Sequence, residues 1–144
     1  MELNELYTEL ILEHNQNRQN KRPLAGVTHS EHGHNPSCGD DITVEAVIEG
    51  GIIRDLAYTG AGCAISQASA SMMADLLKGR SLQEGLELTQ RFIAMIKRED
   101  IPEEKLEELG DAYVLKNIQN MPARVKCAVL AWHALQELLK REKV

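Results

Sequence analysis

The sequence predicts an α+β fold in which helices pack on one face of a small antiparallel sheet. Two strand-like segments joined by a tight turn lie before the middle of the chain, and helical patterns follow them. This order lacks the strand–helix–strand alternation of a parallel sheet. A chain of 144 residues, 43% apolar and 26% charged, suits one globular domain over residues 1–144.

The N-terminal part of the chain begins with a predicted amphipathic helix. The apolar side chains that recur there at helical spacing are Leu3, Leu6, Tyr7, Leu10 and Ile11. The polar stretch EHNQNRQNKRP follows, and then a histidine-rich segment, HSEHGHNPSCGD. The first helix is expected to end in the polar stretch, and the histidine-rich segment is interpreted as a loop.

A β-hairpin is the next predicted element. From Asp41 onward the residues alternate between apolar and polar over about eight positions, which is typical of a half-buried strand. Gly50-Gly51 can adopt the positive φ angles of a tight turn, and IIRDLAYT is the returning strand.

The remainder of the chain is predicted to be helical. An apolar stripe after Gly60-Ala61-Gly62 stops at Gly79, and Ser81 with Glu84 forms a capping box that opens a second helix. The charged segment KREDIPEEKLEELGD is a connector with room for one short helical piece. A final long helix is predicted to begin near Pro122.

Composition excludes several classes of protein. A net charge of −6 and only 3% aromatic residues argue against a nucleic-acid-binding protein. No run approaches 18 apolar residues, so no membrane span is expected. The start, MELNELYTEL, lacks the basic and apolar regions of a secretory signal, which indicates a cytoplasmic protein. Three cysteines in such a chain are better suited to metal binding, reactivity or the core than to disulfides.

Each cysteine lies at a structural junction. Cys38 is in a polar loop before a strand, Cys63 lies where a strand ends and a helix begins, and Cys127 is in the opening turns of the last helix. A helix N-terminus favours the thiolate, and Arg124 lies on the same helix face as Cys127, where its charge can help. A small buried hydrophobe remains an equally good interpretation of Cys127.

Two further groups of residues resemble metal ligands. Asp40 follows Cys38 across one glycine, so both can face one ion, although Asp40 can equally cap a turn. The histidines His29, His32 and His34 are interpreted as loop residues without a functional metal. The Gly60-Ala61-Gly62 run lacks the third glycine of a dinucleotide-binding turn, and that function is rejected.

The segments NPSCGDDI, TGAGCAISQASASMM and MPARVKCAVLAW resemble the three cysteine motifs of the IscU/NifU-like scaffold family. The resemblance runs in the same order over nearly the whole chain and includes EHNQNRQNK. It implies a three-stranded antiparallel sheet, with a further strand before Asn35. Lys126, where IscU-type members have histidine, and the insertion-like KREDIPEEKLEELGDAYVLKN resemble the SufU branch.

The same resemblance implies a site and its partners. Cys38, Asp40, Cys63 and Cys127 are the implied ligands of zinc, or of a transient iron–sulfur cluster. Cys38 is the implied sulfur acceptor, with Cys127 as the alternative. The implied partners are a PLP-dependent cysteine desulfurase and downstream cluster assembly or acceptor proteins. His34, where relatives usually have asparagine, adds a potential ligand near this site.

Three functions remain open at this point. Within the family, the protein is either a cluster scaffold or a zinc-dependent sulfurtransferase, and Lys126 with the insertion favours sulfur transfer. Outside it, Cys38 or Cys127 paired with His34 or His133 would make a metal-independent thiol enzyme. A structural zinc module that binds a partner is the third possibility.

Overall fold

The computed structural model describes residues 3–16, 18–36 and 39–143, so Cys38 lies outside the described residues. Its strands are β1 (His29–Asn35), β2 (Asp40–Glu49) and β3 (Ile52–Ala61). They form an antiparallel sheet in the order β1-β2-β3. This confirms the predicted α+β class and the three-stranded sheet, including the strand before Asn35 that the resemblance implied.

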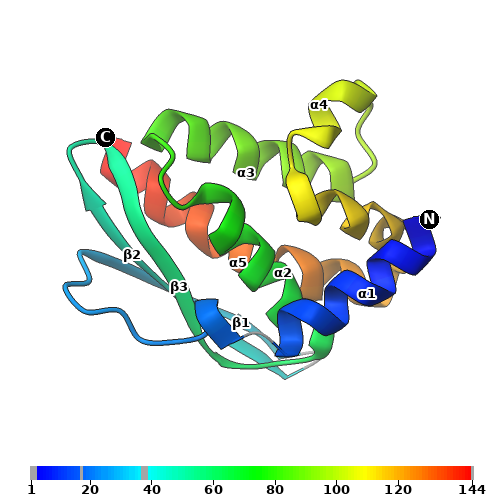
Figure 1. Cartoon of the computed structure of the whole chain (residues 1–144), viewed down its shortest axis with the longest axis horizontal. Helices are drawn as coiled ribbons and strands as arrows, with labels where there is room; N and C mark the ends of the chain where they lie inside the picture. The colour runs from blue at the N-terminus through cyan, green and yellow to red at the C-terminus, as the bar shows by residue number, and fades with distance from the viewer. Residues whose placement is uncertain (1–2, 17, 37–38, 144) are drawn as a thin grey trace.

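Helices cover one face of this sheet, as Figure 1 shows. They are α1 (Leu3–Gln16), η1 (Arg18–Asn20), α2 (Ala64–Leu77), α3 (Leu82–Ile96), α4 (Glu103–Glu107), η2 (Gly110–Asn120) and α5 (Pro122–Lys143). Helix α5 packs on β1 and β2, α2 packs on β3, and α1 packs on α2 and η2. Among the described residues, no helix is long and apolar enough to cross a bilayer.

The predicted hairpin between β2 and β3 is confirmed. Gly50 and Gly51 both have positive φ, at 59° and 76°, which glycine adopts without steric cost. The apolar side of β2 is buried against the helices, as its alternation predicted. A register shift between Val47 and Ile48 marks an irregularity near the turn.

His29–Asn35, the first part of the histidine-rich segment, form strand β1, so their interpretation as a loop was wrong. β1 pairs along its whole length with β2, from His29 opposite Ala46 to Asn35 opposite Asp40. Its inward face carries no apolar side chain: Glu31 bonds Arg141 of α5, a side chain at Gly33 would contact Leu130, and the strand ends on the buried Asn35. Period-two hydrophobicity therefore could not reveal this edge strand.

The connector before the last helix is more ordered than predicted. The short helical piece is confirmed as α4, but the 11-residue 3₁₀ helix η2 was not predicted. Three of its four buried residues, Ala112, Leu115 and Ile118, recur every third position, and the fourth is Val114. That spacing matches the three residues per turn of a 3₁₀ helix rather than the 3.6 of an α-helix, and a search for α-helical period passes over it.

Helices α2 and α5 are fixed to each other by a buried polar contact beside an aromatic stack. The Trp132 ring stacks on Phe92 with centroids 4.0 Å apart and planes 12° apart. Trp132 Nε1 donates to Ser69 Oγ at 2.8 Å, and Ser69 Oγ donates to the Ala128 carbonyl oxygen at 2.6 Å. Because every partner is buried, this contact sets how the two helices lie relative to each other.

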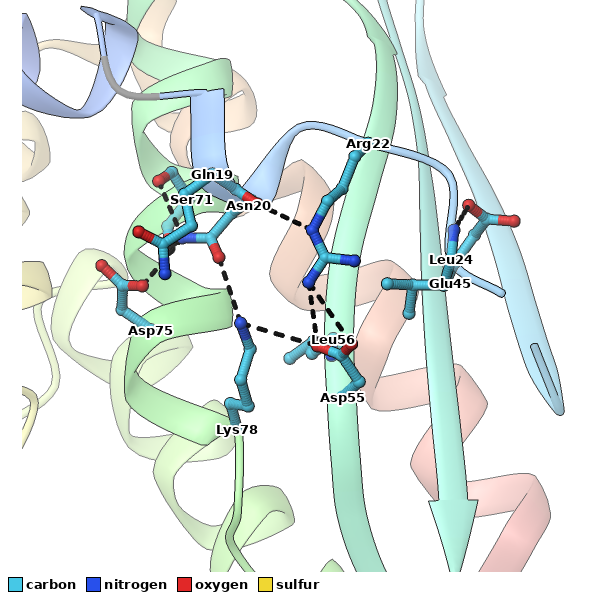
Figure 2. Close-up of polar contacts among 10 residues, drawn as sticks. All are labelled: Gln19, Asn20, Arg22, Leu24, Glu45, Asp55, Leu56, Ser71, Asp75 and Lys78. Carbon is cyan, nitrogen blue, oxygen red and sulfur yellow. Dashed lines mark hydrogen bonds and ion pairs between the residues drawn. The ribbon is translucent and has the colours of Figure 1, made fainter. Parts of the chain in front are cut away.

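The polar stretch after α1 is anchored to α2 and β3 by the contacts in Figure 2. Asn20 Nδ2 donates to the Ser71 carbonyl oxygen at 3.1 Å and to Asp75 Oδ1 at 2.8 Å. Arg22 Nη2 and Lys78 Nζ lie 3.2 Å and 3.5 Å from Asp55 Oδ1. The segment is therefore built into the fold although it lacks apolar period.

Candidate metal centre

Three elements that are far apart in sequence meet at one point. Asp40 begins β2, Cys63 precedes α2, and Cys127 lies in the second turn of α5. One ligand atom from each of these residues lies within 4.8 Å of those from the other two. Asp40 and Cys127 are buried and Cys63 is half-buried. Three of the four ligands that the resemblance implied thus come together, and Cys38 lies outside the described residues.

Asp40 contributes a buried carboxylate to this cluster, from the first position of β2. Its side chain is fully buried, and Oδ1 accepts a hydrogen bond from the Cys63 backbone N–H at 2.9 Å. Burial of a carboxylate is costly without such partners. A carboxylate has two oxygens with about four lone-pair sites, so the bond to Cys63 leaves acceptor capacity for a cation. The capping role and the ligand role considered for Asp40 are therefore compatible.

Cys63 is the N-cap residue of α2. Its backbone is extended (φ −73°, ψ 169°), and its Sγ accepts from the Ser66 backbone N–H at 3.5 Å. Ser66 Oγ donates in return to the Cys63 carbonyl oxygen at 3.0 Å. The N-cap position therefore holds the Cys63 sulfur at the start of α2, beside Asp40 and Cys127.

The glycines before Cys63 allow the close packing of the centre. A Cβ on Gly62 would lie 2.7 Å from Asp40 Oδ1 and 2.4 Å from Ser66 Oγ. A Cβ on Gly60, whose φ is +115°, would lie 2.0 Å from the Asp41 carbonyl oxygen. All three distances are too short for a real side chain, so only glycine lets β3 and the start of α2 approach the start of β2 this closely.

Cys127 is positioned by the contact between α2 and α5. It is 1% exposed, and its neighbour Ala128 accepts the hydrogen bond from Ser69 of α2. Because Ser69 lies six residues after Cys63, this bond ties the two cysteine-bearing helix starts together. The small-buried-residue interpretation of Cys127 is correct about burial, but the thiol also faces Cys63 and Asp40.

Tyr7 of α1 is a neighbour of the centre that sequence reasoning missed. Burial raises the pKa of Tyr7, the positive charge of Arg124 acts to lower it, and Cys63 acts to raise it. The phenol therefore lies within electrostatic reach of both Arg124, which is exposed, and Cys63. Asn15 Nδ2 of the same helix donates to the Ala64 carbonyl oxygen at 3.0 Å. Helical spacing marked Tyr7 only as an apolar-stripe residue.

A surface hollow of about 380 Å³ lies where β1 meets α5. It is lined by His34, Asn35, Pro36, Lys126, Val129, Leu130 and His133. The hollow brings together the two histidines named for a thiol enzyme, but Cys127 is not in its lining. His133 is exposed, whereas Cys127 on the same helix is buried. This arrangement gives the pairing of Cys127 with His133 no support.

The chain is similar to known proteins over nearly its whole length. Residues 6–141 match the family described as the NifU-like N-terminal domain. The chain is 39% identical over 139 residues to the iron–sulfur cluster assembly scaffold protein IscU of Streptococcus pyogenes serotype M1, covering 96% of this chain and 86% of the relative. It is 35% identical over 141 residues to the zinc-dependent sulfurtransferase SufU of Bacillus subtilis strain 168, covering 98% and 94%.

A solved structure is similar as well. It is a protein of Fervidobacterium islandicum AW-1 described as a candidate iron–sulfur cluster assembly scaffold for the SUF system. It superposes with a TM-score of 0.83 at 32% identity, covering 94% of this chain and 97% of the other. The sheet, the helices and their connections are therefore shared over almost the full length of both proteins.

Proposed function

Because the chain is an IscU/NifU-like protein of the SufU type, in a family whose members assemble iron–sulfur clusters, we propose that it accepts sulfur from a cysteine desulfurase at a zinc-bound cysteine site. The convergence of Asp40, Cys63 and Cys127 within 4.8 Å carries this proposal. The likeness to a zinc-dependent sulfurtransferase over 98% of the chain supports zinc as the metal.

The donor set fits zinc. Thiolate sulfur and carboxylate oxygen both bind Zn²⁺, in sites that are usually tetrahedral. Asp40, Cys63 and Cys127 supply three such donors, and we assign the fourth position to Cys38, two residues from Asp40 in sequence. Bound zinc would keep the thiols deprotonated.

Cys38 is assigned the transfer step. Its thiolate attacks the outer sulfur of a persulfide on the desulfurase. The S–S bond of that persulfide breaks, the partner's cysteine leaves as a thiolate, and Cys38 keeps the added sulfur as a persulfide. In sequence, Cys38 lies between β1 and β2, whereas Cys63 and Cys127 belong to helix starts. Cys63 Sγ accepts the Ser66 N–H, and Ala128, next to Cys127, accepts the Ser69 hydroxyl. Connections between strands commonly carry the groups that meet a partner.

Arg124 and Cys127 are assigned supporting roles. Arg124 is exposed and within electrostatic reach of Tyr7, whose pKa also responds to Cys63. The positive charge of Arg124, beside the cysteine centre, would stabilise the negative charge of a thiolate or persulfide during sulfur transfer. Cys127 is the alternative acceptor, since its sulfur shares the centre. Downstream assembly or acceptor proteins would receive the sulfur.

A cluster scaffold is the second candidate function. The likeness to a named scaffold over 96% of the chain supports it. Three thiolates can hold cluster iron, and the Asp40 carboxylate is a harder, weaker ligand for iron than a fourth thiolate. Such a site would release a cluster more readily than an all-cysteine site.

Persulfide mapping distinguishes the two candidates. Zinc-loaded protein is incubated with a cysteine desulfurase and cysteine, and mass spectrometry locates the added sulfur. We expect the Cys38→Ser variant to accept no sulfur and to leave desulfurase turnover unstimulated, because the nucleophile is missing. The matched Cys63→Ser variant should bind zinc at least tenfold more weakly and still take sulfur on Cys38. Persulfide on Cys127 alone, with Cys38→Ser still accepting sulfur, would contradict the assignment and favour the scaffold.

A further inference from the structure

The strand conformation of β1 sorts its histidines onto two faces. Side chains alternate along a strand, so His32 and His34 share the outward face of β1, and His29 lies on the other face. Because β1 is the edge strand, His34 also lines the hollow beside α5. The inward face is identified by Glu31, which bonds Arg141 of α5. Two of the three histidines are therefore neighbours on an open surface, an arrangement that sequence spacing alone did not establish.

Asp41 of β2 completes this outward group. It is the register partner of His34 and lies diagonally across from His32. Asp41 Oδ1 is 2.6 Å from His32 Nε2, and the rings of His32 and His34 stack with centroids 6.3 Å apart and planes 15° apart. The side chains of His32 and Asp41 are 54% and 59% exposed, so a solvated ion can reach them.

We propose that His32, His34 and Asp41 form a second site for a divalent cation of the zinc type, separate from the cysteine centre. Two imidazoles and one carboxylate are a donor set that holds zinc in three positions and leaves the fourth to water. The cation would take the place of the hydrogen atom in the hydrogen bond between His32 Nε2 and Asp41 Oδ1. The distance from the cation to each histidine nitrogen and to the carboxylate oxygen would be about 2.0–2.2 Å.

The change that binding requires is confined to side chains. The rings now lie side by side, and their nitrogens do not converge on one point as the cysteine-centre ligands do. Exposed side chains can change rotamer at a cost of the order of 1 kcal/mol. The backbone pairing of β1 with β2 already holds the three Cα positions, so no loop has to become ordered. Because all three ligands are exposed, we expect weaker binding than at the buried centre.

The two sites occupy opposite faces of the same strand. Asp40 and Asp41 are consecutive in β2, so the side chain of Asp40 points to the helices and that of Asp41 points away from them. The buried set is sulfur-rich and the outward set is nitrogen-rich. The chain would thus hold two cations near the start of β2, separated by the sheet and distinguished by ligand type.

Zinc titration of the full chain tests this inference independently of sulfur transfer. Protein carrying one equivalent of zinc is titrated with further ZnCl₂ by calorimetry, and the histidine ring resonances are followed by NMR. We expect a second equivalent to bind and to shift the resonances of His32 and His34. The H32A and H34A variants should each weaken it at least tenfold. The matched control H29A, on the other face, should bind as the wild type does.

Two outcomes would overturn the second site. One is the absence of a second equivalent in the wild type, or an equal loss in H29A. The other is loss of the second equivalent in Cys63→Ser with no effect of H32A, since that would place both ions at the cysteine centre. Retention of the histidine-dependent equivalent in Cys63→Ser would instead support two separate sites, whatever the protein does with sulfur.

Discussion

Gly62 controls the geometry of the candidate metal centre by having no side chain. Its backbone lies against the Asp40 carboxylate, which in turn accepts the Cys63 N–H. An added methyl group would lie within 3.0 Å of Asp40 and Ser66, a contact that real Cβ atoms essentially never make. The Asp40 carboxylate and the Cys63 backbone N–H would have to move apart, although neither Asp40 nor Cys63 had been changed.

We predict that Gly62→Ala weakens zinc binding at least tenfold, because Asp40 can no longer approach Cys63. Competition with a chromogenic chelator measures the affinity. The control is Gly26→Ala, where φ is +71° but nothing lies within 4 Å of the added methyl. That variant should lose about 1 kcal/mol of stability through backbone strain and keep its zinc affinity. Wild-type zinc affinity in Gly62→Ala would show that this packing does not set the ligand geometry.

The segment between α1 and β1 is a structural element tied to α2 and β3 by hydrogen bonds and ion pairs, and its Leu24 is buried. Asp55 of β3 is one of its anchors: it is flanked by Arg22 of the segment and by Lys78, and it accepts the Leu56 backbone N–H (Figure 2). Burial acts to raise the pKa of Asp55. The Leu56 and Arg22 hydrogen bonds and the charges of Arg22 and Lys78 outweigh it and lower the pKa below 3.8.

This depressed pKa gives a pH dependence of known sign. The ionised Asp55 stabilises the fold above its ordinary pKa of about 3.8, and the contribution is lost as pH falls through the lower folded pKa. We predict that Asp55→Asn is less stable than the wild type at pH 7 and that the difference shrinks below pH ~3.8. Urea unfolding at low salt from pH 7 to pH 3 measures this, with exposed Asp100→Asn as control. A difference that does not change with pH would contradict the role of the charge.

On the scale of the whole molecule, the fold has a core that does not rely on the metal centre. The buried apolar residues run continuously from β2 and β3 through α2 and α3 to α5, with Trp132 and Phe92 stacked at the centre. Small domains that need zinc to fold lack such a core. Here the candidate metal ligands Asp40, Cys63 and Cys127 lie at the starts of β2, α2 and α5.

We therefore predict that removing zinc with a chelator lowers the melting temperature without unfolding the protein at 25 °C. A ligand present at 100 times its Kd stabilises by about 2.7 kcal/mol, which is the size of the expected loss. Circular dichroism with and without chelator measures it, and Cys63→Ser should respond less to zinc. Complete unfolding of the metal-free protein would instead support the structural zinc module.

The sequence by itself determined the secondary elements that repeat an apolar pattern and the residues whose identity is tied to chemistry. The β2–β3 hairpin, α2, α3 and α5 follow from period and from Gly50-Gly51. The cysteine motifs indicated the family. Strand β1 and helix η2 were hidden. The inward face of β1 carries polar residues and glycine where apolar residues usually stand, and three buried residues of η2 recur every third position.

Only the tertiary structure decided which side chains act together. Cys63 and Cys127 are 64 positions apart, and no spacing rule places them beside Asp40; the Ser69 contact between α2 and α5 and the close approach at Gly62 do. The pairing of β1 with β2 likewise places His29 on one face of the sheet and His32 and His34 on the other. The physical reason is that periodicity encodes which face of an element is buried, whereas distances between elements are set by how their buried surfaces fit together.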